Sequence, residues 1–207
     1  MSDNKNKFEF SIKQIEKDLC YDVRVLREDA SVADYIRELD DFLDDKVAPC
    51  IGCTLCCSQR IPLTLGDFYT YAGKNRINIK CFLEQFCEVR TDGSVVDIKL
   101  KQMEGGDCIF LDAPNQKCGN HQRRSLVCHT YICLPQTARG RGLREALIDR
   151  GENALVAYLL SAGFLPSVMA TSEDYPLDKV WQDKTFEEIL LKDTLTEELW
   201  ESLKAES

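Results

Sequence analysis

The pattern of apolar and polar positions changes at Ser31. Residues 1–30 are polar and weakly periodic, and they predict at most a short strand or an extended arm near Tyr21–Leu26. From Ser31 the apolar residues recur at helical spacing, and Asp34 follows the candidate cap by three residues. Pro49 is expected to end this helix. The residues on the predicted helical face are Val32, Tyr35, Ile36, Leu39, Phe42, Leu43 and Lys46.

Two further helices are predicted after residue 60. Thr64 and Asp67 have the spacing of a helix cap and its reciprocal partner, which predicts a short helix that ends at about Lys74. A second helix is predicted over residues 78–89 from its apolar spacing.

A hairpin is expected in the next part of the chain. Residues 95–101 alternate between apolar and polar side chains and predict a half-buried strand. Residues 108–111 predict a second strand, and the turn-forming residues 112–117 reverse the chain after it. Cys118 would then lie on the returning strand or just past it.

The C-terminal third of the sequence is predicted to be helical. Residues 142–162 form a long amphipathic stretch. A short helix is expected to begin at Asp183 or Thr185 and to end at Leu191. Residues 194–197 have the pattern of a capping box for a last helix.

Together these elements predict an α+β protein that is mainly helical, with a small irregular cysteine-rich metal-binding core that contains one β-hairpin. With 207 residues and 44% apolar side chains, the chain can form one domain of ordinary size with added helices. We expect an N-terminal arm and helix over residues 1–47, a cysteine-cluster metal-binding domain over residues 48–135, and a C-terminal helical region over residues 136–207.

Charge and targeting signals narrow the expected partners. The formal net charge is −9, so the chain lacks the positive surface that binds nucleic acid or an anionic membrane. The longest apolar stretch, residues 154–165, is shorter than the roughly twenty residues that span a bilayer. Residues 1–7 are polar and no apolar core follows them, so no signal peptide is expected. We therefore expect a cytoplasmic protein whose thiols stay reduced.

Cysteine placement is the strongest chemical signal in the sequence. The chain has eleven cysteines, and eight of them lie in two groups. An odd number of cysteines in a reducing compartment argues against a disulfide framework and favours metal binding, because thiolates are soft metal ligands. The predicted metal ligands are Cys50, Cys53, Cys56 and Cys57 in the first group, and Cys108, Cys118, Cys128 and Cys133 in the second.

The spacing of Cys50, Cys53 and Cys56 matches the first three ligands of a bacterial ferredoxin cluster. A fourth ligand is expected from Cys128 or Cys133. The eight thiols suit one or two 4Fe–4S iron–sulfur clusters, or two zinc ions in all-thiolate sites. Because adjacent side chains diverge, Cys56 and its neighbour Cys57 serve different ligand sets, or one of them lies outside the coordination sphere.

The other cysteines and the two histidines are weaker candidates. Cys20, Cys81 and Cys87 are expected to be small buried apolar residues. His121 and His129 both lie within the second cysteine group, so each is a candidate ligand or a polar neighbour of the ligands.

These motifs resemble the YkgJ-type cysteine-cluster family, which is described as a zinc- or iron-chelating domain. The Cys-x-x-Cys-x-x-Cys-Cys run of that family matches residues 50–57, and its Cys-x-Phe-Leu strand matches residues 108–111. Its next two cysteines match Cys118 and Cys128, and Cys133 is the last. The resemblance covers residues 48–135.

Some positions depart from the family pattern. Arg124 stands at the family's arginine, but Ser125 replaces a proline, His121 replaces a tyrosine, and His129 stands where an arginine often follows. These changes leave the implied metal binding intact and make histidine ligation a possibility to test. One branch of the family resembles flagellin lysine N-methylases, in which an iron–sulfur cluster is implicated.

Three functions follow from these observations. The first is an iron–sulfur protein that serves electron transfer or cluster-dependent chemistry, with a protein as redox partner or client. The second is a zinc-binding structural or protein-interaction module. The third is a protein-modifying transferase related to flagellin lysine N-methylase, in which His129 would lower the pKa of the Cys128 thiol. The sequence identifies no catalytic residue, reaction or oligomeric state.

Overall fold

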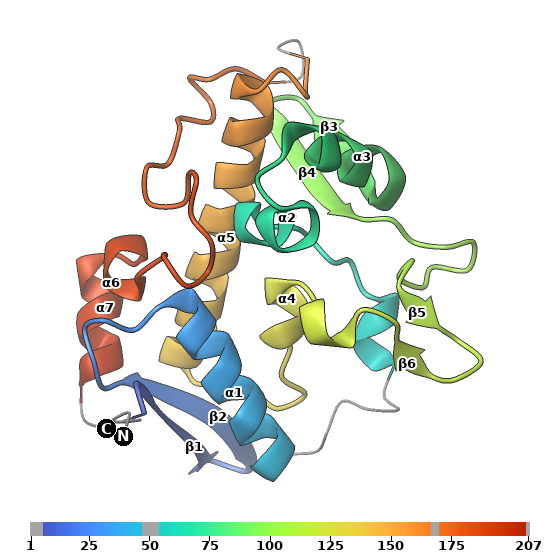
Figure 1. Cartoon of the computed structure of the whole chain (residues 1–207). Coiled ribbons are helices and arrows are strands. Elements are labelled where there is room, and N and C mark those ends of the chain that lie inside the picture. The colour runs from blue at the N-terminus through green and yellow to red at the C-terminus, as the bar shows by residue number, and fades with distance from the viewer. Residues whose placement is uncertain (1–5, 47–53, 167–169, 206–207) are drawn as a thin grey trace, which may run out of the picture. The chain divides into compact units, whose positions relative to one another are not determined.

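The computed structural model describes residues 6–46, 54–166 and 170–205. Within them the chain forms helices and three two-stranded antiparallel sheets, which confirms the predicted mixed α+β class (Figure 1). None of the described helices combines the length and the apolar character needed to cross a membrane.

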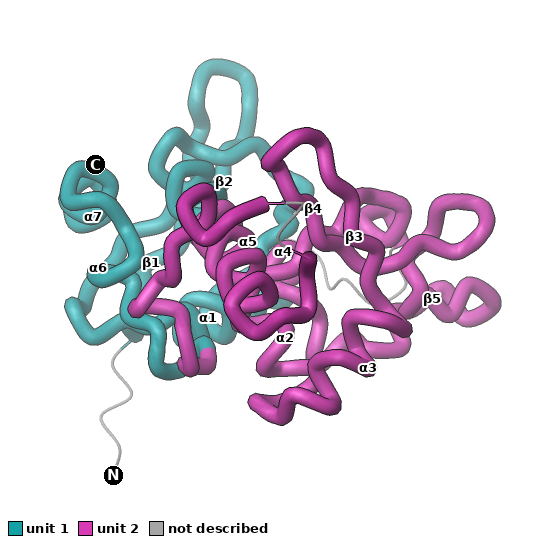
Figure 2. Tube along the Cα trace, turned by 90° about the horizontal axis from the view of Figure 1, so that it is seen from above, with its two compact units in different colours: residues 1–49, 130–147, 186–207 teal, residues 50–129, 148–185 magenta. Residues whose placement is uncertain are grey.

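The residues group into two compact units, each built from separate stretches of the chain (Figure 2). Helix α5 (Ala138–Ser161) contributes residues to both. The three-segment division expected from the sequence stays a prediction. Unit 1 comprises residues 1–49, 130–147 and 186–207, and unit 2 comprises residues 50–129 and 148–185.

A β-hairpin opens unit 1, where the sequence predicted only a short strand or arm. Strand β1 (Phe8–Ile15) pairs with β2 (Asp18–Val25) along its whole length. The turn between them includes Glu16, whose φ is 54°. One face of the hairpin is aromatic: Phe10 stacks on Tyr21 with ring centroids 6.1 Å apart. This face packs in a cluster whose members are Phe8, Phe10, Tyr21, Tyr35 and Phe42.

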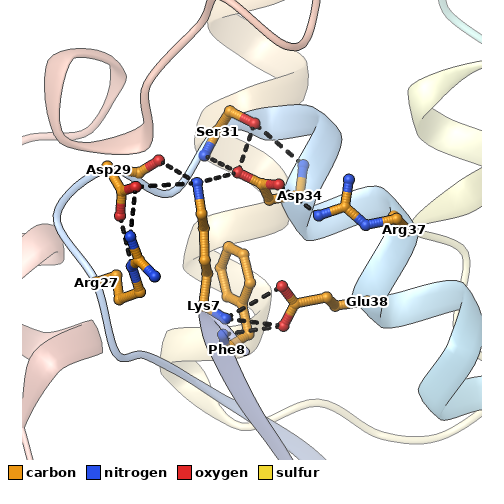
Figure 3. A network of polar contacts seen from close by, with 8 residues as sticks. All are labelled: Lys7, Phe8, Arg27, Asp29, Ser31, Asp34, Arg37 and Glu38. Carbon is orange, nitrogen blue, oxygen red and sulfur yellow. Dashed lines mark hydrogen bonds and ion pairs between the residues drawn. The ribbon is translucent and has the colours of Figure 1, made fainter. Parts of the chain in front are cut away.

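Helix α1 (Val32–Lys46) begins with the predicted cap. Ser31 Oγ accepts a hydrogen bond from Asp34 N at 3.1 Å, and Asp34 Oδ2 accepts one from Ser31 N at 3.0 Å. Figure 3 shows how Lys7 joins this cap, with its Nζ 2.8 Å from Asp34 Oδ2. Glu38 on the same helix accepts hydrogen bonds from the backbone N–H groups of Lys7 and Phe8. These contacts hold the start of β1 on the helix.

Strand β2 contacts α5 and the last helix of unit 1. Asp22 is 2% exposed and forms an ion pair with Arg139 at the start of α5. The unit ends with α6 (Leu191–Thr194) and α7 (Glu197–Lys204). The capping position predicted for the last helix was wrong by two residues, because Thr196 is the residue whose side chain accepts from Leu199 N.

The predicted helix ending at Leu191 was also wrong. Residues 186–188 form a turn, and Leu190 makes an isolated antiparallel bridge with Ser31. The backbone of this segment forms hydrogen bonds with another part of the chain. The Phe186 carbonyl accepts a hydrogen bond of 3.0 Å from Ala33 N. Pairing with α1 thus replaces the internal hydrogen bonds that a helix would need.

In unit 2, helix α2 (Leu65–Ala72) has the predicted capping box between Thr64 and Asp67. It ends at Gly73, whose φ of 63° favours glycine.

Helix α3 (Arg76–Phe86) follows, with Asn75 as its cap. The predicted helix over residues 78–89 therefore began too late and ran too far. Strand β3 (Cys87–Asp92) starts at Cys87 and pairs with β4 (Val95–Leu100), which the sequence did predict.

The second hairpin of unit 2 is short. Strands β5 (Leu111–Asp112) and β6 (Lys117–Cys118) pair as predicted, but the strand predicted over residues 108–111 reaches back only to Leu111. Leu111 N donates to Cys108 O at 2.9 Å, which closes a turn in place of an extended strand. A 3-10 helix η1 (Leu55–Ser58), a 3-10 helix η2 (His121–Arg123) and the short helix α4 (Leu126–His129) complete the cysteine-bearing part.

Candidate metal centre

The structure describes six of the eight predicted ligands. Cys50 and Cys53 lie outside the described residues. Cys133 belongs to unit 1 and is exposed. Unit 2 contains the remaining five, which come from three separate segments of the chain: Cys56, Cys57, Cys108, Cys118 and Cys128.

The first segment is η1, which precedes α2 in the chain. A hydrogen bond of 2.9 Å from Cys57 N to Thr54 O closes this short turn. Cys57 is 8% exposed, whereas Cys56 is half-buried. The carbonyl of Cys57 accepts from Cys108 N at 2.7 Å, so the first and second cysteine segments are joined directly through the backbone.

The second segment places one cysteine before the β5–β6 hairpin and one at its end. Cys108 is 4% exposed and pairs with Gln102 in an isolated bridge. Cys118 lies opposite Leu111 in the register of the hairpin. Gly119 N donates to Phe110 O at 2.8 Å, which keeps the chain paired just past Cys118.

The third segment is helix α4, which carries Cys128 and is anchored by a buried carboxylate. Asp67 is 1% exposed, and its Oδ1 accepts from Leu126 N at 2.8 Å. Its Oδ2 accepts from the backbone N–H and the hydroxyl of Thr64, each at 2.8 Å. Ser125 Oγ also donates to Cys128 Sγ at 3.3 Å. One carboxylate thus holds the starts of both α2 and α4.

The five thiols interact with one another electrostatically. Burial, with contributions from the neighbouring thiols Cys56, Cys118 and Cys108, raises the pKa of Cys57 to about 12. Burial likewise raises the pKa of Cys128 to about 12, with Cys56 and Cys108 adding to it. Both effects disfavour thiolates in the absence of a cation. A bound metal ion reverses this balance, because it stabilises the deprotonated sulfur. The chemistry of this donor set therefore fits a thiophilic metal.

An orphaned polar atom lies in the same region. The hydroxyl oxygen of Tyr71 on α2 is shielded from solvent and has no hydrogen-bond partner in residues 6–46, 54–166 and 170–205. The hydroxyl interacts electrostatically with Asp67, Cys128, Cys108 and Cys118. Neither Tyr71 nor the double role of Asp67 was predicted from the sequence. Their spacing of four residues on one helix face was the signal that placed them together.

The coordination set itself stays a prediction. Across the described ranges, no three or more His, Cys, Asp and Glu side chains are arranged as a metal-binding group. The two histidines have other interactions there. His121 Nε2 lies 2.6 Å from a guanidinium nitrogen of Arg124, and His129 interacts electrostatically with Asp67.

Two expectations about individual cysteines need correction. The thiol of Cys128 was expected to have a lowered pKa if it were a nucleophile beside His129. Its pKa is raised instead, chiefly by burial. Cys81, expected to be buried, is exposed on α3. Cys20 and Cys87 are buried as expected, and burial raises the pKa of Cys87 to about 12.

Comparison with known families bears on the same segment. Residues 49–144 match the sequence model of the CxxCxxCC family, which is described as "Putative zinc- or iron-chelating domain". This match confirms the resemblance drawn from the cysteine spacing, and it supports metal binding in general. No curated protein and no solved structure was found to match the chain.

Proposed function

Because residues 49–144 match the model of a family described as a zinc- or iron-chelating domain, we propose that this protein holds an iron–sulfur cluster of the 4Fe–4S type. The cluster serves electron transfer or cluster-dependent chemistry. The main support for this proposal comes from Cys56, the third cysteine of the ferredoxin-like run. Its thiol interacts electrostatically with those of Cys57, Cys108 and Cys128. Remote thiols are what that run needs to complete a cluster.

The ligands of the proposal are the eight clustered cysteines. When bound, a four-iron cluster supplies a one-electron carrier whose potential depends on the hydrogen bonds and burial around its sulfurs. The chain contributes buried thiols on anchored backbone, since η1 is joined to Cys108 and α4 is held by Asp67. The proposed ligand set is Cys50, Cys53, Cys56, Cys57, Cys108, Cys118, Cys128 and Cys133.

Partner and compartment follow from this chemistry. Free thiols persist in a reducing compartment, so the proposal places the protein in the cytoplasm. Electron transfer also requires a protein that exchanges electrons with the cluster. The net charge of −9 favours a partner with a positively charged docking face, because complementary charge speeds the encounter.

A zinc site is the second candidate. Four thiols interact electrostatically without any contribution from Cys50 or Cys53. Cys57 interacts with Cys118 and Cys108, and Cys108 also interacts with Cys128. Four thiolates are the ligand number and type of a structural zinc site. In this case the domain would be a structural or protein-interaction module whose folding depends on the metal.

Metal analysis of protein purified without oxygen separates these candidates. The iron–sulfur proposal predicts iron with matching acid-labile sulfide, and stoichiometric zinc without sulfide would replace it with the second candidate. Cys108→Ser should lose most of the metal, since Cys108 is buried within the thiol group. Cys81→Ser is the matched control, because Cys81 is exposed on α3, and it should keep the wild-type content.

A further inference from the structure

Contacts with two other aromatic rings hold the side chain of Tyr71 in place. The ring stacks on Phe82 of α3 with centroids 4.9 Å apart and an interplanar angle of 23°. On another side it lies near Phe110, with centroids 6.0 Å apart. Two aromatic neighbours from different segments therefore fix the direction of the hydroxyl group.

That hydroxyl has no hydrogen-bond partner among the residues that the structure describes, and its oxygen is shielded from solvent. The strongest electrostatic neighbour of Tyr71 is Asp67, but the Asp67 oxygens already accept from Thr64 and Leu126. The other neighbours are the thiols of Cys128, Cys108 and Cys118, in that order.

A shielded hydroxyl without a partner is rare, because leaving it unpaired costs free energy that folding must offset. A bound ion or cofactor that accepts from the hydroxyl is one established reason for such a group. A neutral thiol is a weak acceptor, whereas a metal-bound thiolate or a cluster sulfide carries negative charge and accepts a stronger hydrogen bond. A metal-bound sulfur beside Tyr71 would therefore supply the acceptor that this hydroxyl lacks in the described part of the chain.

We propose that the Tyr71 hydroxyl donates a hydrogen bond to a sulfur of the metal centre and thereby tunes it. This inference rests on the proposed metal centre and assigns to it a residue that is not a ligand. The donated hydrogen bond stabilises negative charge on sulfur. It therefore strengthens metal binding by the thiolates and, in an iron–sulfur cluster, raises the reduction potential.

Tyr71→Phe tests the proposal, because it removes only the hydroxyl and keeps the ring between Phe82 and Phe110. Tyr69→Phe on the same helix is the matched control, since Tyr69 accepts a hydrogen bond from Asp183 N at 3.3 Å. The probe is Co²⁺, added to the metal-free full chain in competition with a chelator. Uptake is followed through the thiolate-to-cobalt absorption.

The two variants should behave in opposite ways. Tyr71→Phe should bind Co²⁺ about 10- to 100-fold more weakly than wild type, while its metal-free form unfolds at the same temperature or higher. Tyr69→Phe should unfold at a lower temperature and keep the wild-type Co²⁺ affinity. In protein reconstituted with iron and sulfide, Tyr71→Phe should also lower the reduction potential of the cluster.

Two results would overturn the inference, and they are distinguishable. If wild type takes up Co²⁺ and Tyr71→Phe matches it in affinity and absorption spectrum, the hydroxyl does not bond to the centre. In that case the metal-binding proposal itself stands. If wild type takes up neither Co²⁺ nor a reconstituted cluster, the metal centre is refuted, and the role of Tyr71 with it.

Discussion

The carboxylate of Asp67 accepts a hydrogen bond of 2.8 Å from the backbone N–H of Leu126, although the two residues are 59 positions apart in the chain. The same side chain caps α2 through Thr64. Leu126 begins α4, which carries Cys128, so this contact fixes the position of a proposed ligand relative to α2. It also explains why a carboxylate is tolerated in the interior, because both of its oxygens accept hydrogen bonds.

Asp67→Asn is therefore expected to destabilise the protein by about 1–3 kcal/mol, since the amide can accept at only one of its two polar atoms. Asp174→Asn is a matched control. Asp174 makes the same pair of hydrogen bonds with Thr171, but at an exposed position. Urea unfolding of both variants checks the prediction. Equal losses in the two would show that the contact with Leu126 contributes nothing.

Gly151 in α5 lies against the same capping box. A Cβ atom added there would lie 2.7 Å from Thr64 Cβ and 2.9 Å from the Trp181 ring. We expect Gly151→Ala to cost about 1–3 kcal/mol through overpacking. Gly142→Ala on the same helix meets only the end of the flexible Leu199 side chain, at 3.1 Å, and should cost far less. Thermal unfolding that ranks Gly142→Ala as the more damaging change would contradict this packing.

Asp22 should make unit 1 sensitive to acid. Burial opposes its ionisation, but hydrogen bonds from Arg139, Lys13 and Thr137 outweigh burial and hold the pKa of this carboxyl well below its usual range. A lowered pKa in the folded state stabilises the protein above pH 4, the range of an unfolded aspartate, and this stabilisation is lost as the pH falls further.

Asp22→Asn should accordingly lose about 2–3 kcal/mol at pH 7, because Arg139 keeps its charge without the carboxylate. The difference between variant and wild type should shrink below pH 4. Unfolding free energies measured at pH 7 and pH 3 give the comparison. A difference that is the same at both pH values would show that Asp22 is not ionised in the folded protein.

Glu152 should have the opposite pH dependence. Burial raises its pKa to about 7, and Arg60 opposes this only in part. A raised pKa means that the folded state holds the proton longer than the unfolded state, so stability falls as the pH rises from about 4.5 to 7. At pH 8 Glu152 is ionised, and its contribution to the stability of the folded protein is at its least favourable.

Glu152→Gln should therefore be more stable than wild type at pH 8 by about 1–2 kcal/mol, a figure reduced for its partial exposure, and closer to wild type at pH 5. Glu173→Gln, at an exposed position, serves as the control and should change stability at neither pH. Loss of stability in Glu152→Gln at pH 8 would mean that the ion pair with Arg60 dominates.

Local signals explain what the sequence did predict. Both capping boxes, Ser31 with Asp34 and Thr64 with Asp67, involve residues three apart, so their chemistry is visible in a short window. The last cap was misplaced because Thr194 donates instead to the Leu190 carbonyl within α6. A competing local hydrogen bond was available there, and the pattern alone could not rank the two.

Long-range pairing explains the errors. Cys87 continues the apolar spacing of α3, yet it lies in β3 because Leu100 pairs with it across the sheet. The N-terminal hairpin was underestimated because Lys13 and Asp22 interrupt its pattern, and both are compensated by an ion pair between them. The association of η1 with Cys108 and α4 likewise depends on contacts between distant segments, so the sequence yielded candidate ligands without their arrangement.

Iron and acid-labile sulfide content, measured with the absorption spectrum of protein purified without oxygen, tests the central proposal most directly. An iron–sulfur protein should contain iron and sulfide in matching amounts and show a broad absorption band at about 400 nm that is lost in Cys108→Ser and kept in Cys81→Ser. Stoichiometric zinc without sulfide, or a protein that stays colourless after reconstitution with iron and sulfide, would contradict the proposal.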